Sequence, residues 1–153
     1  MEQEDGKSGR FSDASERVIG ACIEVHRHLG PGLLESAYRE CLGHEFRLRG
    51  LTFVSEKPLP VAYKGILLDC GYRLDFIIED SIVLEIKAVE HLLPVHQAQI
   101  LTYLKLTELD TGLLVNFNVA LIKQGLRRLT RKKELSLPVF PPSCSTPSTC
   151  DDL

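Results

Sequence analysis

The sequence lacks any apolar run long enough to cross a membrane. Its longest apolar stretches fall far short of the roughly 20 residues that span a bilayer. Residues 1–10 are charged and lack the apolar stretch of a secretory signal peptide. We therefore expect a cytoplasmic protein with no membrane partner. Repeats are also missing, and 153 residues with 44% hydrophobic and 25% charged residues fit one domain that buries a core.

Zinc-binding patterns are absent as well. No pair among the five cysteines has zinc-finger spacing. Cys22, Cys41 and Cys70 lie in apolar segments, which predicts reduced core thiols in a reducing compartment. Four histidines suit neither a zinc finger nor an H-E-x-x-H helix, and we expect most of them to be ordinary surface residues: His26, His28, His91 and His96.

An excess of positive charge is also missing. The net charge of −3 argues against a protein that coats nucleic acid by bulk attraction, although a local patch can still act. One run of basic residues is compatible either with a solvated surface or with phosphate contacts, and the sequence leaves both interpretations open. It carries six positive charges within eleven residues: Lys123, Arg127, Arg128, Arg131, Lys132 and Lys133.

Hydrophobic periodicity divides the chain into helices and strands. Asp13 is a candidate N-cap with Glu16 as its capping-box partner, and the helix that follows should end at the Gly-Pro-Gly of residues 30–32. Further helices are predicted over 33–49 and 94–106. Extended segments are predicted over 52–63, 66–78, 82–87 and 112–117, with a hairpin turn at Lys64 and Gly65.

This pattern predicts an α/β domain with the order α-α-β-β-β-α-β. We expect the domain to cover residues 12–134. Residues 1–11 should form a disordered arm. Residues 135–153 are rich in Pro, Ser and Thr and should form a disordered tail.

The most informative segment is D-F-I-I-E-D-S-I-V-L-E-I-K, residues 75–87. A strand alternates its side chains, so Glu85 and Lys87 should lie on the same side of theirs. The apolar residues between and before them should bury that strand. Burying an ionised group costs several kcal/mol unless the group is paired or binds a metal, so charges in a core strand indicate a function.

The position of Asp75 depends on the register of the hairpin. If residues 79–81 form the loop, Ile78 pairs with Ile82, and Asp75 falls opposite Glu85 on the same face. Their Cβ atoms would then be roughly 4.5–5.5 Å apart, close enough for one hard cation to bridge the carboxylates. A two-residue loop would instead move Asp75 to the other face.

The residue types suit phosphodiester hydrolysis. A magnesium ion held by one or two carboxylates can neutralise phosphoryl charge and make a water nucleophilic. Asp75 and Glu85 would be the ligands, with the Ile86 carbonyl as a third. Lys87 could contact both the water and a phosphate oxygen.

The order of elements and motifs resembles the PD-(D/E)xK nuclease superfamily, which has the restriction-endonuclease-like fold. More closely, G-L-L-E-S-A-Y at residues 32–38 matches the motif that names the bacterial GxxExxY proteins, and residues 18–129 are similar to that family throughout. R-L-D, E-I-K and Q-I-L-T-Y follow in the right order. One departure is Leu74, which stands where the superfamily's name has proline. The resemblance implies a central mixed β-sheet flanked by helices, and it implies that Glu35 helps to hold the metal.

The resemblance also implies roles for five further residues. Asp75 and Glu85 correspond to the metal-binding carboxylates, and Lys87 corresponds to the lysine that orients or deprotonates water. Gln99 and Tyr103 match the Q-x-x-x-Y of recombination exonucleases, and their spacing of one helical turn makes them project together. We expect them to contact the phosphate or to position Lys87.

These observations predict a nuclease that depends on Mg²⁺ or Mn²⁺ and acts on nucleic acid, with DNA as the expected form. Lys123, Arg127, Arg128 and Arg131 are the candidate phosphate contacts outside the catalytic site. The alternative is a catalytically inactive module with the same fold that binds nucleic acid or a protein partner. The sequence leaves open DNA or RNA, endonuclease or exonuclease, and the oligomeric state, for which a homodimer is one option.

Overall fold

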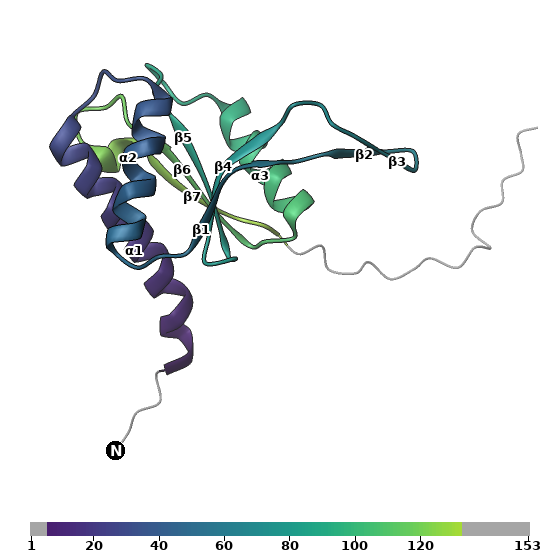
Figure 1. Cartoon of the computed structure of the whole chain (residues 1–153), viewed down its shortest axis with the longest axis horizontal. Coiled ribbons are helices and arrows are strands. Elements are labelled where there is room, and N and C mark those ends of the chain that lie inside the picture. The colour runs from purple at the N-terminus through teal and green to yellow at the C-terminus, as the bar shows by residue number, and fades with distance from the viewer. Residues whose placement is uncertain (1–5, 133–153) are drawn as a thin grey trace, which may run out of the picture.

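The computed structural model describes residues 6–132, which form three α-helices around a five-stranded sheet and a separate two-stranded hairpin (Figure 1). The predicted α/β class is confirmed. The helical elements are α1 (Gly6–Leu29), α2 (Glu35–Leu48), α3 (Pro94–Thr107) and the 3₁₀ helix η1 (Ile122–Gly125). The strands are β1 (Phe53–Pro58), β2 (Val61–Tyr63), β3 (Ile66–Leu68), β4 (Arg73–Ile78), β5 (Ile82–Lys87), β6 (Thr111–Asn116) and β7 (Leu126–Thr130).

The large sheet has the order β1-β4-β5-β6-β7 and is mixed. β5 and β6 are parallel, and the other neighbours are antiparallel. A parallel pair needs a crossover connection, and α3 supplies it. α1 and α2 cover one face of the sheet and α3 covers the other (Figure 1). We call these the α1/α2 face and the α3 face.

Each face of the sheet has its own hydrophobic cluster. Strand alternation sends Phe76, Ile78, Leu84 and Ile86 to the α1/α2 face, where they pack against buried residues of both helices. A smaller cluster on the α3 face joins apolar residues of β4, β5 and β6 to the inner side of α3: Leu74, Ile77, Val83, Ile100, Tyr103, Leu104 and Leu114, with Leu59 beside them.

The N-terminal prediction was wrong in two respects. α1 begins at Gly6, so residues 6–11 are helical and Asp13 lies inside the helix, not at its N-cap. The other two helices lie close to their predicted bounds. Pro94 occupies the first turn of α3, where its missing N–H costs no helical hydrogen bond.

The strand prediction was incomplete. The segment predicted as one strand over 66–78 contains β3 and β4, separated by a bend at Gly71 with φ of 80°. β7 was not predicted, because the sequence Leu-Arg-Arg-Leu-Thr does not alternate between apolar and polar residues. It forms at the sheet edge by pairing with β6.

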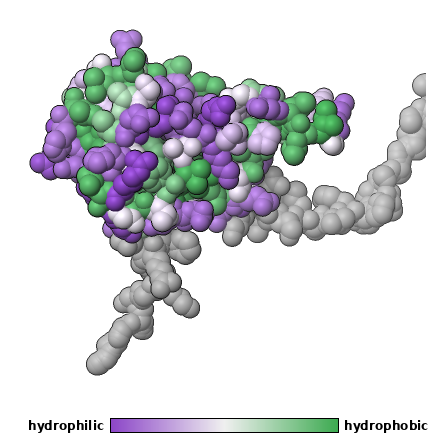
Figure 2. Space-filling view, in the orientation of Figure 1, coloured by the Kyte–Doolittle hydropathy of each residue, from purple (hydrophilic) through white to green (hydrophobic). Residues whose placement is uncertain are grey.

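The β2–β3 hairpin, residues 61–68, projects away from the body of the molecule (Figure 1). Hydrophobic surface gathers on it (Figure 2). The exposed apolar side chains on it are Tyr63, Ile66, Leu67 and Leu68.

Several predictions lie outside the described residues: the remainder of the N-terminal arm, Lys133, and the tail with Cys144 and Cys150. No helix within residues 6–132 is long and apolar enough to span a bilayer.

Candidate active site

The hairpin of β4 and β5 has the register that the three-residue loop predicts. Ile78 pairs with Ile82, and Phe76 pairs with Leu84. The loop residues Glu79 and Asp80 both have positive φ, and the Ser81 amide donates to the Ile78 carbonyl at 3.1 Å.

Beyond Phe76 and Leu84, two carboxylates bridge the strands. The Asp75 amide donates to Glu85 Oε1 at 3.1 Å, and the Ile86 amide donates to Asp75 Oδ2 at 2.8 Å. Each carboxylate is therefore held by a backbone N–H of the opposite strand. These reciprocal bonds fix Asp75 and Glu85 beside each other across the hairpin.

Glu85 is the more deeply placed of the two acids, with 5% of its surface exposed. Burial, with a smaller contribution from the charges of Asp75 and Glu35, raises the pKa of Glu85 to about 8, against the lowering effects of the Asp75 amide and Lys87. Without a cation, the folded protein therefore favours the neutral form of Glu85.

Gln99 and Tyr103 lie on α3 as a linked pair. Gln99 Nε2 donates to the Tyr103 hydroxyl oxygen at 2.8 Å. Burial and the nearby charge of Glu85 raise the pKa of Tyr103 to about 12, which keeps the phenol neutral. Tyr103 packs in the same apolar cluster as Val83, which precedes Glu85 by two residues on β5. Lys87 follows Glu85 by two residues, so it shares this side of β5, and it is partly buried.

Glu35 and Tyr38 belong to one motif but have different surroundings. Glu35 Oε2 accepts a hydrogen bond from the Ala88 amide at 3.3 Å, directly after β5, so α2 reaches the end of the site. The Tyr38 hydroxyl donates to the Gly30 carbonyl at 2.5 Å and accepts from the Leu33 amide at 3.2 Å. Tyr38 is fully buried and stacks on Phe117, so its contacts are structural.

Arg39 is a site residue that sequence reasoning missed. Its Nε donates to Asp75 Oδ1 at 3.0 Å, and its Nη1 lies 3.7 Å from Glu56 Oε1. The available signal was helical spacing, because Arg39 follows Glu35 by four residues and therefore lies on the same side of α2. No pattern in the sequence connects it to Asp75, 36 positions away.

Comparison with known families settles the fold family. The family model of the PD-(D/E)XK nuclease superfamily matches residues 12–129, which is most of the chain. The chain belongs to this superfamily. No curated protein and no solved structure matches it. The mixed sheet between helices is accordingly a restriction-endonuclease-like fold, and the narrower resemblance to GxxExxY proteins stays a prediction.

The chemistry of the donor set suits the divalent cation that this superfamily generally uses. Residues 6–132 contain no group of three or more His, Cys, Asp or Glu side chains that could hold a metal. Mg²⁺ needs no such group, since it is commonly bound by one or two carboxylates and keeps several waters. Asp75 and Glu85 provide two, and a carboxylate oxygen that accepts one hydrogen bond retains a lone pair.

The predicted basic residues do not form one surface. Leu114 of β6 pairs with Glu85 on one side and with Arg127 on the other, so Arg127 lies on the α3 face in the same row as Glu85. Arg128 pairs with Leu113 and points to the opposite face. Lys123 lies apart, on η1. Arg131 Nη2 lies 3.2 Å from Asp110 Oδ1, which offsets part of its charge.

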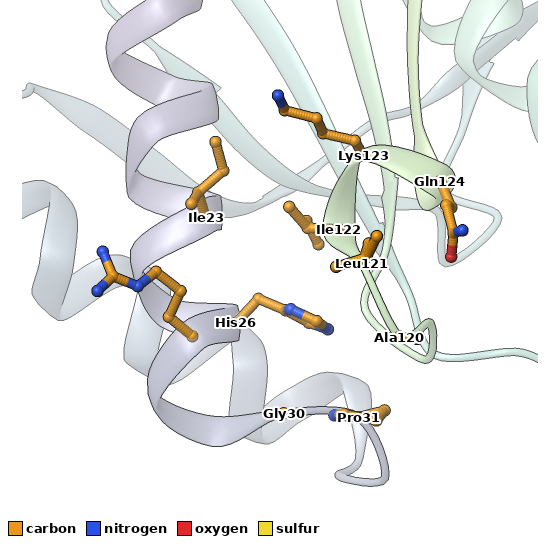
Figure 3. Close-up of a pocket in the computed structure, with 10 residues that line it drawn as sticks. Ile23, His26, Gly30, Pro31, Ala120, Leu121, Ile122, Lys123 and Gln124 are labelled. Atoms are coloured by element: carbon orange, nitrogen blue, oxygen red, sulfur yellow. The ribbon is translucent and has the colours of Figure 1, made fainter.

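The expectation for cysteine needs correction, and among the four histidines His26 is the one that is buried. Cys22 is buried as predicted, but Cys41 is only partly buried and Cys70 is exposed. His26 is 8% exposed, and its Nε2 lies 2.9 Å from the Val119 carbonyl oxygen. Its ring extends from α1 toward the segment of Leu121 and Ile122, where it lines a cavity of about 560 Å³ (Figure 3).

Proposed function

We propose that the protein is a metal-dependent nuclease that hydrolyses phosphodiester bonds of nucleic acid, with DNA as the substrate. The observation that carries this proposal is the pair Asp75 and Glu85, held beside each other across the hairpin with Lys87 on the same side of β5. Membership in a nuclease superfamily supports it. In that superfamily, paired strand carboxylates followed by a lysine are the catalytic signature.

Asp75 and Glu85 would hold Mg²⁺ or Mn²⁺, with the Ile86 carbonyl as a third ligand and Glu35 at the end of the site. When bound, the metal supplies a Lewis acid for the phosphoryl group and lowers the pKa of a water. Glu85 must release its proton to become a ligand, because burial favours its neutral form. The Asp75 amide holds the Glu85 carboxylate in position, and the Ile86 amide holds the Asp75 carboxylate.

Lys87 would orient the attacking water and contact a phosphate oxygen. Its position two residues after Glu85, on the same side of β5, supports this role. Tyr103 stays a neutral phenol and can donate to a phosphate oxygen, and Gln99 holds that phenol in place. Arg127 lies in the same row of the sheet as Glu85. It is therefore the basic residue best placed to contact the nucleic-acid backbone beyond the site. Lys123, Arg128 and Arg131 remain candidates for contacts further away.

A second candidate function is a catalytically inactive module that binds nucleic acid or a protein partner. Arg39 favours it, because its guanidinium already pairs with Asp75 Oδ1 while the Ile86 amide occupies Oδ2. Such a module would have no need of a cation at Asp75 and Glu85.

A cleavage assay separates the two functions. Purified protein is incubated with single-stranded, double-stranded and branched DNA and RNA, with Mg²⁺, Mn²⁺ or a chelator. The nuclease cuts at least one substrate with metal and none with chelator, and Asp75→Asn abolishes cutting. Glu40→Gln, which changes an exposed acid on α2, is the matched control and should cut like the wild type. Binding without cutting under every metal would favour the inactive module.

A further inference from the structure

A cavity of about 660 Å³ lies between α3 and the base of the β2–β3 hairpin. Its volume falls within the roughly 300–1,000 Å³ of small-ligand pockets. One wall is a single stripe of α3 at helical spacing, which includes Val95, Ala98, Gln99, Thr102, Tyr103 and Leu106. The opposite wall consists of Leu59, Val61 and Tyr72.

This cavity adjoins the candidate active site. Gln99 and Tyr103 line it, and Tyr103 packs in the same apolar cluster as Val83, two residues before Glu85 on β5. Tyr72 lines the same cavity. Tyr72 precedes Asp75 by three residues, which spans about 10 Å in an extended chain. The Leu59 amide donates to the Tyr72 carbonyl at 2.9 Å, so the backbone of this wall is fixed.

We propose that the cavity binds one unpaired nucleobase of the substrate strand, next to the phosphate that lies at Asp75 and Glu85. This inference rests on the proposed function and names its substrate class. Tyr72 is 46% exposed and supplies an aromatic surface for stacking. The Gln99 carbonyl oxygen and the Thr102 hydroxyl supply polar groups for the edge of the base.

The charge and chemistry of the cavity select a base over other occupants. An anionic group would find no Lys or Arg among the residues that line the cavity, whereas a base is neutral. A purely aliphatic group would offer no hydrogen bond to the Gln99 carbonyl oxygen or the Thr102 hydroxyl. A nucleotide is the ligand that combines a flat neutral ring with a phosphate a short distance away.

A base that is paired and stacked in a duplex cannot enter this cavity without leaving the helix, which costs a few kcal/mol. The cavity therefore selects single strands, frayed ends or flaps over intact duplex. The preference should appear in binding as well as in cleavage.

The test places 2-aminopurine, one position at a time, along a short single-stranded DNA and follows its fluorescence on binding to the full-length protein. Chelator is present, so that no cleavage is needed. We expect a fluorescence change at one position. Tyr72→Ala should abolish the change and weaken single-strand binding by about 5- to 150-fold, whereas Tyr72→Phe should retain both because it keeps the ring.

Two further variants control for folding and for location. Tyr63→Ala removes another exposed tyrosine, which lies on the β2–β3 hairpin outside the cavity, and should bind like the wild type. Ala98→Trp fills the cavity from α3 and should block the base as Tyr72→Ala does. If Tyr72→Ala and Ala98→Trp both weaken single-strand binding, two independent variants support the proposal.

Unchanged single-strand affinity in Tyr72→Ala and Ala98→Trp, with no responsive 2-aminopurine position, would overturn the proposal even if the protein cuts DNA. A Tyr72-dependent signal in a protein that cuts nothing would support the cavity and count against the nuclease. If Ala98→Trp changes the sedimentation of the free protein but leaves single-strand affinity unchanged, a second copy of the chain occupies the cavity, and the proposal is overturned.

Discussion

The two faces of the central sheet bury different kinds of side chain, although the same strands supply both. On the α1/α2 face, Phe46, Phe76 and Phe117 are fully buried within one continuous apolar cluster. On the α3 face, β5 carries Glu85 and Lys87, and the smaller apolar cluster lies beside them. Alternation along a strand lets one segment serve the core and a polar site at once. We therefore propose that the α1/α2 face mainly supplies stability and that the α3 face carries the chemistry, with Glu35 and Arg39 reaching the site from α2.

The largest effect is expected from Lys87→Ala on the α3 face. If Lys87 orients or activates water, cleavage should fall by about 10²- to 10⁴-fold. Metal affinity should survive, because Asp75 and Glu85 remain. Single-turnover cleavage and metal titration measure the two quantities. Lys57→Ala, at an exposed position on β1, is the control, and equal losses in both variants would remove Lys87 from the mechanism.

Phe46→Ala tests the opposite face. Its ring packs against Phe53 and Phe76 with centroids 5.6 and 5.1 Å away, and the substitution should cost about 3–5 kcal/mol in free energy of unfolding. Urea denaturation measures the cost, and Leu48→Ala, at an exposed position on α2, should cost much less. The folded variant should still cut DNA at close to the wild-type rate. A large loss of cleavage in fully folded Phe46→Ala would show that the faces are not independent.

A divalent cation bound at Glu85, on the α3 face, should stabilise the fold. A divalent cation at a hundredfold excess over its dissociation constant should raise the free energy of unfolding by about 2.7 kcal/mol. Glu85→Gln should remove this gain, and Glu40→Gln should keep it. Thermal melts with and without Mg²⁺ or Mn²⁺ provide the measurement. Identical melting temperatures under all of these conditions would exclude a metal site at Glu85.

The pH dependence of the metal-free protein should also report on Glu85. The folded state keeps the Glu85 proton up to a pKa of about 8, whereas an unperturbed glutamate releases it near 4.5. Stability should therefore fall as the pH rises between these values, by at most about 1.4 kcal/mol per pH unit from this group. Glu85→Gln should lack this component, so the difference between the two denaturation curves isolates it. Parallel curves would show that Glu85 titrates normally in the folded protein.

Local patterns predicted the core of the candidate site because they depend on neighbouring residues. The loop of residues 79–81 fixed the register as far as Phe76 and Leu84, and hydrogen bonds to the opposite strand hold Asp75 beside Glu85. Helix periodicity likewise placed Gln99 and Tyr103 together, and they share a hydrogen bond. The strand β7 was missed because its pairing with β6, not its own sequence, decides its conformation.

By itself, the sequence determined the order of the main helices and strands, the hairpin register and the side of β5 on which Glu85 and Lys87 lie. These features follow from periodicity and loop length, which act over a few residues. Only the tertiary structure decided that Arg39 of α2 would pair with Asp75, that Tyr72 and α3 would enclose a cavity, and that Arg127 and Arg128 would face opposite sides. Such contacts join segments distant in the chain, and they depend on how whole elements pack. No local pattern encodes that packing.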